Sequence, residues 1–195
     1  MKNFFLFALT VVFLSCSTAF CAEKKATPGM GLALKADYVN FTDSFVKDND
    51  IDKSIYMAVE GYAHVAPEIF LGLEVGIANP SSTVSNHKTE LTYIPIELNA
   101  KYVGEFLPNW NLGIGGGLSY NYAEETVVSG GSAFRNDDWL LGGQVFAELL
   151  YASGNYFVGF NYKRQFTDNF EGSGGAVPAH RYSNWRLGGL AGVRF

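Results

Sequence analysis

The chain has 195 residues, which is enough for one domain and too few for a convincing second. Charged residues make up only 17% of it, against about 25% in typical soluble domains, whereas apolar residues reach 48% and aromatic residues 15%. The formal net charge is −5, and this acidic balance argues against a nucleic-acid partner.

The N-terminal segment has the pattern of a secretory signal peptide. Lys2 supplies the positive start, residues 4–14 form an apolar run interrupted only by Thr10, and small residues follow. We expect a cleaved signal of residues 1–21 (1–22 if the cut follows Ala22) and a mature domain from residue 22 to 195. A membrane-anchor helix and a lipoprotein acylated at Cys16 are the alternatives, although the run is about half the ~20 residues that a spanning helix needs.

Both cysteines, Cys16 and Cys21, lie inside the predicted signal. We therefore expect the mature chain to have no disulfide, no thiolate nucleophile and no cysteine-based metal site. Removal of Lys2 makes the expected mature charge about −6.

Eight stretches of the mature chain alternate apolar side chains with polar or small ones, which is the period of a β-strand. In the clearest of them, Ile69, Leu71 and Leu73 share one face, and Glu74 lies on the other. Pro95 removes a hydrogen-bond donor in the middle of a strand, so we expect a bulge or kink there. The eight predicted strands are 30–41, 53–65, 69–78, 91–103, 112–122, 139–151, 156–166 and 184–195.

The connections between these strands alternate in length. Residues 66–68 and 152–155 are tight turns, and residues 104–111 form a somewhat longer one. Four polar segments without helical periodicity separate them, at residues 42–52, 79–89, 123–138 and 167–183. This alternation is typical of outer-membrane barrels, which have long outside loops and short periplasmic turns.

The polarity of the two strand faces distinguishes the possible architectures. A soluble barrel or sandwich has an apolar interior and a charged exterior. Here the apolar face continues from strand to strand without a charge in its middle, and the other face combines glycines with charges. We interpret the second face as the narrow, plugged lumen of a membrane barrel, where charges must pair. The predicted lumen network is Lys35, Glu60, Glu74, Glu97, Lys101, Glu148, Lys163, Arg186 and Arg194, with His64 as a further member.

Aromatic residues of the apolar face gather near the two predicted ends of the strands. This is the distribution expected at two membrane–water boundaries. The set near the short turns is Tyr102, Trp110, Tyr151 and Phe195, and the set near the long loops is Tyr38, Tyr120, Tyr122, Trp139, Tyr162 and Trp185.

Three segments carry a resemblance to a known class. The segment Tyr93-Ile-Pro-Ile-Glu-Leu-Asn-Ala-Lys-Tyr102, the run Gly113–Gly117 and the ending Gly-Val-Arg-Phe195 resemble the small OmpA-like and Ail/OmpX-like eight-stranded outer-membrane barrels. The resemblance covers nearly the whole mature chain, and its motifs are specific to the class rather than to one protein. It implies a lumen closed by a Glu/Lys/Arg network, and it implies that Phe195 belongs to the signal read by the barrel-assembly machinery.

The sequence contains no convincing arrangement of catalytic residues. The histidines are His64, His87 and His180, and their separation does not match metal-ligand spacing. His180 and Ser183 share one loop with Glu171, but their His-x-x-Ser spacing differs from the His-x-Ser arrangement of lipid A deacylase barrels. Asp43, Asp48, Asp50 and Asp52 do not match a calcium loop. We predict no catalytic, cofactor or metal site.

The prediction is an all-β, eight-stranded, antiparallel, up-and-down transmembrane β-barrel in the outer membrane. Its expected function is structural or adhesin-like, without catalysis. The expected partners are outer-membrane lipid, the barrel-assembly machinery and an extracellular ligand at the four loops, and the barrel itself is expected to be a monomer. The alternatives are an outer-membrane lipid-modifying enzyme and a soluble periplasmic lipid-binding barrel.

Overall fold

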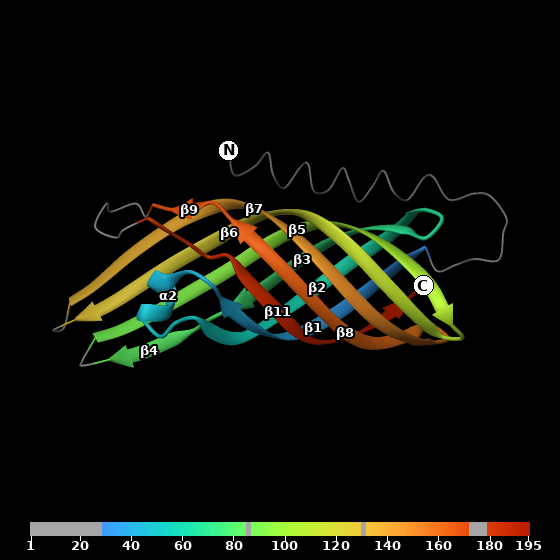
Figure 1. The fold of residues 1–195 in the computed structure, drawn as a ribbon, viewed down its shortest axis with the longest axis horizontal. Helices are drawn as coiled ribbons and strands as arrows, with labels where there is room; N and C mark the ends of the chain where they lie inside the picture. The colour runs from blue at the N-terminus through green and yellow to red at the C-terminus, as the bar shows by residue number, and fades with distance from the viewer. Residues whose placement is uncertain (1–28, 85–86, 130–131, 172–178) are drawn as a thin grey trace.

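Eight antiparallel strands close into one ring in the computed structural model, which describes residues 29–84, 87–129, 132–171 and 179–195 (Figure 1). The predicted signal peptide lies outside the described residues. Pairing of β1 with β11 and of β3 with β5 completes the ring, so the predicted eight-stranded barrel is confirmed. Its strands are β1 (Met30–Phe41), β2 (Lys53–Ala66), β3 (Ile69–Ala78), β5 (His87–Leu107), β6 (Trp110–Ser129), β7 (Ser132–Ser153), β8 (Tyr156–Thr167) and β11 (Asn184–Arg194).

The connections are more ordered than the sequence predicts. The segment 42–52 contains a short helix, α2 (Ser44–Asp48), whose first turn is capped by Asp43. The strand β4 (Ser81–Val84) pairs with β5, and β9 (Asn169–Phe170) pairs with β10 (His180–Arg181). Among the described residues, no helix is long and apolar enough to cross a bilayer.

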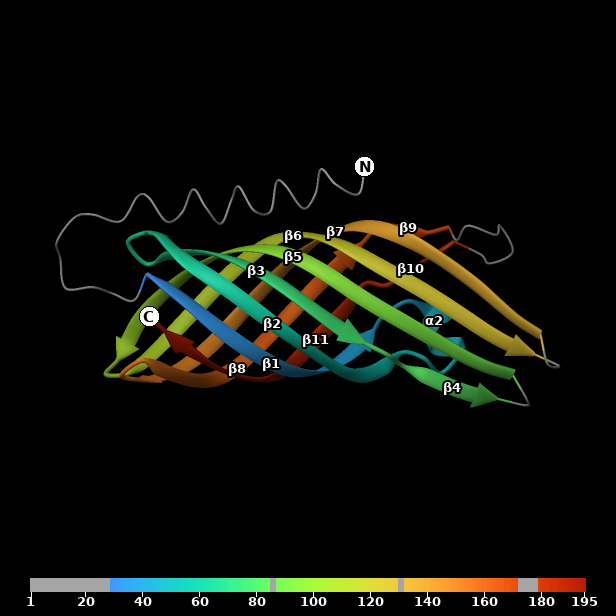
Figure 2. The same ribbon diagram turned by 180° about the vertical axis from the view of Figure 1, so that it is seen from behind.

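The predicted loop at residues 123–138 is wrong, because β6 and β7 continue through most of it as a paired hairpin. Beyond the apolar band the outer face of these strands meets water instead of lipid, so it no longer has to be apolar and the alternation that marks the rest of each strand is lost. Figure 2 shows this hairpin and β4 reaching past α2. We call this the loop end of the barrel.

Three tight turns join the strands at the opposite end, which we call the turn end. Each turn holds one residue with positive φ: Glu68 (64°), Asn109 (69°) and Gly154 (59°). The predicted turn at residues 104–111 is shorter than expected, because β5 runs to Leu107 and β6 begins at Trp110. All three connections are therefore compact hairpins.

The strands are staggered around the ring. Following the paired residues once around, from Lys53 through Arg164 and Gly116, leads back to β2 at Ala63, ten residues further along. Such a shear requires the strands to tilt against the barrel axis. The tilt is visible in Figure 1.

The barrel is apolar outside and polar inside. Leu34, Met57, Leu118 and Phe160 expose 61–71% of their surface on the outer face, whereas Glu74 inside is fully buried. Large apolar groups are exposed along every strand of the ring, which is unfavourable in water and favourable in lipid. Closing the ring also gives the strand backbones partners, as a bilayer requires. This polarity excludes the soluble-barrel alternative and identifies a transmembrane barrel.

Aromatic pairs mark both rims of the apolar band. At the turn end, the rings of Trp110 and Tyr151 lie 5.3 Å apart. Nearer the loop end, Tyr120 stacks on Trp139 at 4.7 Å, and the rings of Tyr38 and Trp185 lie 5.5 Å apart. The two predicted aromatic sets therefore contain cross-strand contacts, in the positions where amphipathic rings stabilise a barrel in a bilayer.

The expected bulge at Pro95 is wrong. Pro95 pairs in regular register with Asn121 of β6. Toward β3, the ladder lacks the pairs of Ile94 and Pro95, but the register is the same on both sides of this gap. A missing N–H removes a hydrogen bond without requiring an extra residue. The register shifts on the flanks of the short turns instead, at His64–Ala66 and Glu105–Leu107.

Inward glycines make room for aromatic rings of neighbouring strands. The Tyr56 ring lies over Gly76, so that a methyl group at this position would fall on the ring. We expect Gly76→Ala to destabilise the barrel by about 1–3 kcal/mol through overpacking, measured by urea unfolding in detergent micelles. Gly61→Ala is the matched control, since no described atom lies within 4 Å of a Cβ there. Equal effects of the two substitutions would contradict this packing role.

Candidate functional site

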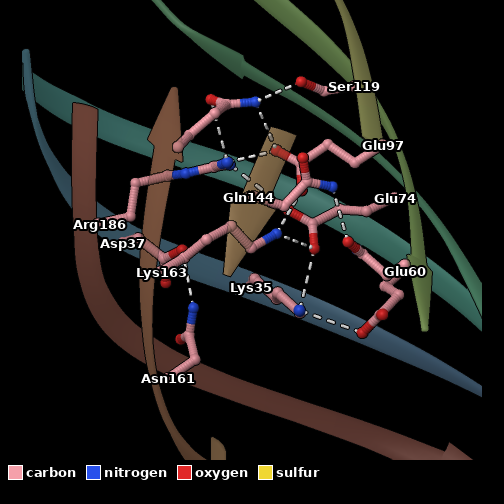
Figure 3. A network of polar contacts seen from close by, with 12 residues as sticks. Lys35, Asp37, Glu60, Glu74, Glu97, Ser119, Gln144, Asn161, Lys163 and Arg186 are labelled. Carbon is pink, nitrogen blue, oxygen red and sulfur yellow. Dashed lines mark hydrogen bonds and ion pairs between the residues drawn. The ribbon is translucent and has the colours of Figure 1, made fainter. Parts of the chain in front are cut away.

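An ion network fills the middle of the lumen (Figure 3). Lys35 of β1 contacts Glu60, Glu74 and Glu148 at 2.9–3.0 Å. Lys101 of β5 contacts Glu60 at 3.1 Å and Glu148 at 3.0 Å. These side chains expose at most 6% of their surface. Each cation therefore has at least two carboxylate partners, as burial of charge demands.

Glu74 joins this half of the network to a second half. Its carboxylate contacts Lys163 at 2.8 Å and Arg186 at 3.5 Å, and it also accepts a hydrogen bond from the Tyr56 hydroxyl at 3.0 Å. Glu97 contacts both Lys163 and Arg186. The four cations and four glutamates balance in charge, and Glu74 is the one glutamate in contact with three of the cations.

The ring of strands explains why these residues meet. Seven strands supply the charged groups, and β6 supplies small inward residues at Gly113, Gly115 and Gly117. The long side chains of facing strands use that space. Aromatic rings then hold the cations from the side: the Arg186 guanidinium lies 4.2 Å from the Tyr56 ring centre and the Lys101 ammonium 4.8 Å from that of Tyr62.

Eight of the nine residues predicted for the network lie together in it. The ninth, Arg194, lies at the turn end and donates to the backbone oxygen of Gly154 at 2.9 Å. It lies eight positions after Arg186 along β11, a distance of about 26 Å, so the shared face does not bring the two together. His64 also lies apart from the ion pairs, with its ring 5.0 Å from that of Phe70.

A layer of uncharged polar groups adjoins the ions on the loop side. Gln165 lies at its centre and donates to Ser119 and Asn121 at 3.0 Å. The oxygen of its amide accepts from Tyr93 at 2.9 Å and from Asn184 at 3.0 Å. Sequence reasoning missed this layer because it followed charges. The signal that could have found it is that the amide side chains of Asn121, Gln165 and Asn184 occupy inward-facing positions of their strands.

An apolar cap covers the loop side of the lumen. Val46 of α2 and Ile51 are fully buried in it, beside Phe41 of β1 and Phe170 of β9. The full cluster is Val39, Phe41, Val46, Ile51, Tyr56, Ala58, Ala78, Leu91, Tyr93, Ala123, Leu140, Phe170 and Tyr182. At the turn end, the Tyr62 ring packs against the rings of both Phe70 and Phe157. The lumen is therefore packed with side chains in successive apolar and polar layers.

A buried polar contact fastens the cap to the barrel wall. His180 Nε2 lies 3.0 Å from both the Glu125 carboxylate and the Tyr182 hydroxyl, and Tyr182 donates to Glu125. The Phe45 ring of the α2 segment stacks on His180 at 4.3 Å. Burial and the neighbouring Glu125 carboxylate raise the pKa of the Tyr182 phenol, so Tyr182 remains a hydrogen-bond donor.

The serine-hydrolase arrangement considered from the sequence is not assembled among the described residues. His180 faces Glu125 and Tyr182, whereas the Ser183 hydroxyl accepts from the Thr167 N–H at 3.1 Å. Glu171 is exposed, and its N–H donates to Asp138. The four glutamates of the ion network, Glu60, Glu74, Glu97 and Glu148, each contact at least two cations.

The acidic residues of the first loop have local structural roles. Asp43 accepts from the N–H groups of Phe45 and Arg181, at 2.9 and 3.2 Å, so it ties α2 to β10. Asp52 lies 3.6 Å from the Lys53 ammonium. Within the described part of the chain, no group of three or more His, Cys, Asp or Glu residues could hold a metal ion.

Comparison with solved structures places this fold among small outer-membrane barrels. Neisserial surface protein A (NspA) is similar over 88% of this chain and 100% of its own, with a TM-score of 0.67 and 15% identity. Ail, the attachment invasion locus protein of Yersinia pestis, is similar over 85% and 99%, with a TM-score of 0.56 and 9% identity. A major outer membrane protein from Thermus thermophilus is similar over 85% and 99%, with a TM-score of 0.54 and 14% identity.

These likenesses confirm, at the level of the fold, the resemblance found in the sequence. No protein-family model and no curated protein matches the chain. At such low identities the solved structures establish the architecture, and function has to be argued from the residues of this chain.

Proposed function

We propose that this chain is a non-catalytic outer-membrane barrel whose loop end presents an interaction surface outside the cell. The observation that carries the proposal is the contrast between a lumen packed with paired charges and an extended, ordered loop end. A lumen filled in this way has little space for a passing solute. The loop end is where the chain offers surface to other molecules.

The extended loop end is built as a small sheet rather than as loose segments. Strands β4, β5, β6 and β7 pair side by side beyond the apolar band. At its tip, Phe134 exposes 65% of its surface, and the Arg135 side chain is largely exposed beside Glu124. Exposed aromatic and arginine side chains on a rigid frame are typical anchors of protein interfaces.

Two of the similar structures support the same kind of role through their descriptions, since one is a surface protein and the other an attachment invasion locus protein. For this chain we propose a surface-interaction role of that general kind, with a ligand that contacts the loop end. The roles of the predicted signal peptide and of Phe195 in export and assembly stay predictions, as does the monomeric state.

Surface labelling tests the proposed orientation. We expect a cysteine at Phe134→Cys to react with a membrane-impermeant maleimide in intact cells, because the loop end faces outward. The matched control is Asn155→Cys, in the turn that follows Gly154 at the other end, which we expect to react only after the cells are opened. The predicted mature chain has no cysteine of its own, so each label reports one position.

Each variant is first checked for folding by its electrophoretic mobility in SDS before and after heating. Labelling of Asn155→Cys but not Phe134→Cys in intact cells would reverse the orientation and overturn the proposal. Labelling of both at equal rates in intact cells would show that the chain does not span the outer membrane, and would overturn the proposal as well.

A further inference from the structure

One charged residue lies on the outer, lipid-facing side of the barrel. Arg164 of β8 has the same parity as Tyr162 and Phe166, whose side chains are exposed on the outer face. All other outward positions of the described ring strands between the two aromatic sets are uncharged. The sequence interpretation places no charge in the middle of this face, and Arg164 lies beside Trp185 of the loop-end aromatic set rather than in that middle.

The contacts of Arg164 direct its guanidinium toward the loop end. Its Nη2 lies 3.5 Å from the Thr42 hydroxyl, and Thr42 directly follows the last residue of β1. The guanidinium carbon lies 5.4 Å from the centre of the Phe166 ring. A long cationic side chain that reaches from an apolar surface toward the rim of the membrane is a snorkelling arginine.

Arg164 has no carboxylate within ion-pair distance among the described residues, in contrast to the cations of the lumen network. Its cross-strand neighbours on the outer face are Trp185 and Val145. Trp185 lies in the loop-end aromatic set and contacts Tyr38. The cation is thus held at the level where the headgroups of the surrounding lipid begin.

We propose that Arg164 binds the phosphate of a lipid in the leaflet at the loop end. A guanidinium matches a phosphate with two parallel hydrogen bonds, and the Thr42 hydroxyl, which donates to the Ser183 carbonyl oxygen, accepts from Arg164 and orients it. The indole of Trp185 covers the apolar part of the same lipid, since aromatic rings prefer this depth. The site faces the bilayer, which favours a lipid phosphate over a free phosphate ion.

This inference rests on the proposed outer-membrane location and adds a ligand class to it. In that membrane, the outward leaflet offers phosphorylated glycolipid. The lipid phosphate therefore supplies the anionic partner that Arg164 lacks among the described residues. Arg164 makes the outer face of the barrel selective for phosphorylated lipid at this one position.

Native mass spectrometry of the mature protein in non-ionic detergent tests the proposal. The probes are bisphosphorylated lipid A and the same lipid with its phosphates removed. We expect wild type to bind the phosphorylated form about tenfold more tightly, as one charge-assisted hydrogen-bonding pair is worth. Arg164→Gln should lose this preference, and Arg164→Lys should keep part of it.

The matched control is Arg181→Gln, which removes an exposed arginine of the loop end whose Nε donates to Asn169 at 2.8 Å. We expect it to bind phosphorylated lipid as wild type does. An unchanged preference in Arg164→Gln, or an equal loss in Arg181→Gln, would overturn the site. Full competition by inorganic phosphate at the lipid concentration would overturn the assignment to lipid.

The two proposals fail in distinguishable ways. Failure of the wild-type protein to insert into lipid vesicles would contradict the proposed function. Insertion together with equal binding of the phosphorylated and dephosphorylated lipid would contradict the Arg164 site alone.

Discussion

Replacement of Glu74 by alanine is expected to lower the free energy of unfolding by about 3–5 kcal/mol, the range measured when one partner of a buried ion pair is removed. Glu74 contacts Lys35, Lys163 and Arg186, so its loss leaves an excess of buried positive charge. The measurement is urea unfolding of the barrel in lipid vesicles or micelles, followed by tryptophan fluorescence.

The matched control is Glu90→Ala at the loop end. Glu90 also forms an ion pair, with Lys88 at 2.6 Å, but both side chains are about half exposed. Water replaces the lost partner there, so the expected change is at most about 1 kcal/mol. A similarly small effect of Glu74→Ala would mean that water or ions enter the lumen freely, and would contradict the packed network.

The second large effect concerns the outer face. We expect Leu73→Arg to destabilise the barrel in a bilayer by about 2–4 kcal/mol, because Leu73 lies in the middle of β3 on the lipid-facing side, and a cation at this depth lacks hydration. The measurement is the same unfolding experiment, carried out in vesicles whose apolar thickness matches the band between the two aromatic sets.

Ile77→Arg is the control for depth. Ile77 lies on the same strand and the same face, four residues nearer the loop end, where a snorkelling arginine reaches the headgroups at a cost of about 0–1 kcal/mol. Equal costs at the two positions would contradict the lipid assignment of this face. In detergent, the difference in destabilisation between Leu73→Arg and Ile77→Arg should be smaller, because a micelle adapts its shape to the charge.

The barrel could be predicted because a membrane imposes a strict rule on each strand. Every second residue of Ile69–Ile77 must suit hydrocarbon, and the alternate ones must fit a crowded interior. This rule identifies the eight strands and the inward set that contains Lys35, Glu74 and Glu97. It acts only within the apolar band.

Outside that band the rule gives no signal, and the predictions there were less accurate. The hairpin at residues 123–138 reads as a polar loop, although its backbone is paired as far as Ser129 and Ser132. The five-residue helix α2 is too short for its period to be recognised. The contact of Glu125 with His180 and Tyr182 joins residues more than 50 positions apart, which no local pattern contains.

The alternation of side chains along a strand predicts which face of the barrel a residue lies on, but it does not predict the residue's height along the barrel. Arg194 and Arg186 share the inner face but lie at different heights along β11, so only Arg186 reaches the glutamates. Arg164 shows the same limit: alternation assigns it to the outer face, and only the strand pairing with Trp185 gives its depth. The contact with Thr42 then shows that its guanidinium points toward the loop end.

The pairing of β1 with β11 has a consequence for how the molecule is made. Leu32 and Val193 face each other in the finished ring, yet almost the whole domain separates them along the polypeptide. Before β11 is available, β1 has no partner on one side, and an open sheet edge would bring unpaired backbone N–H and C=O groups into the hydrocarbon of the bilayer. The ring therefore cannot be sealed until β11 has been delivered.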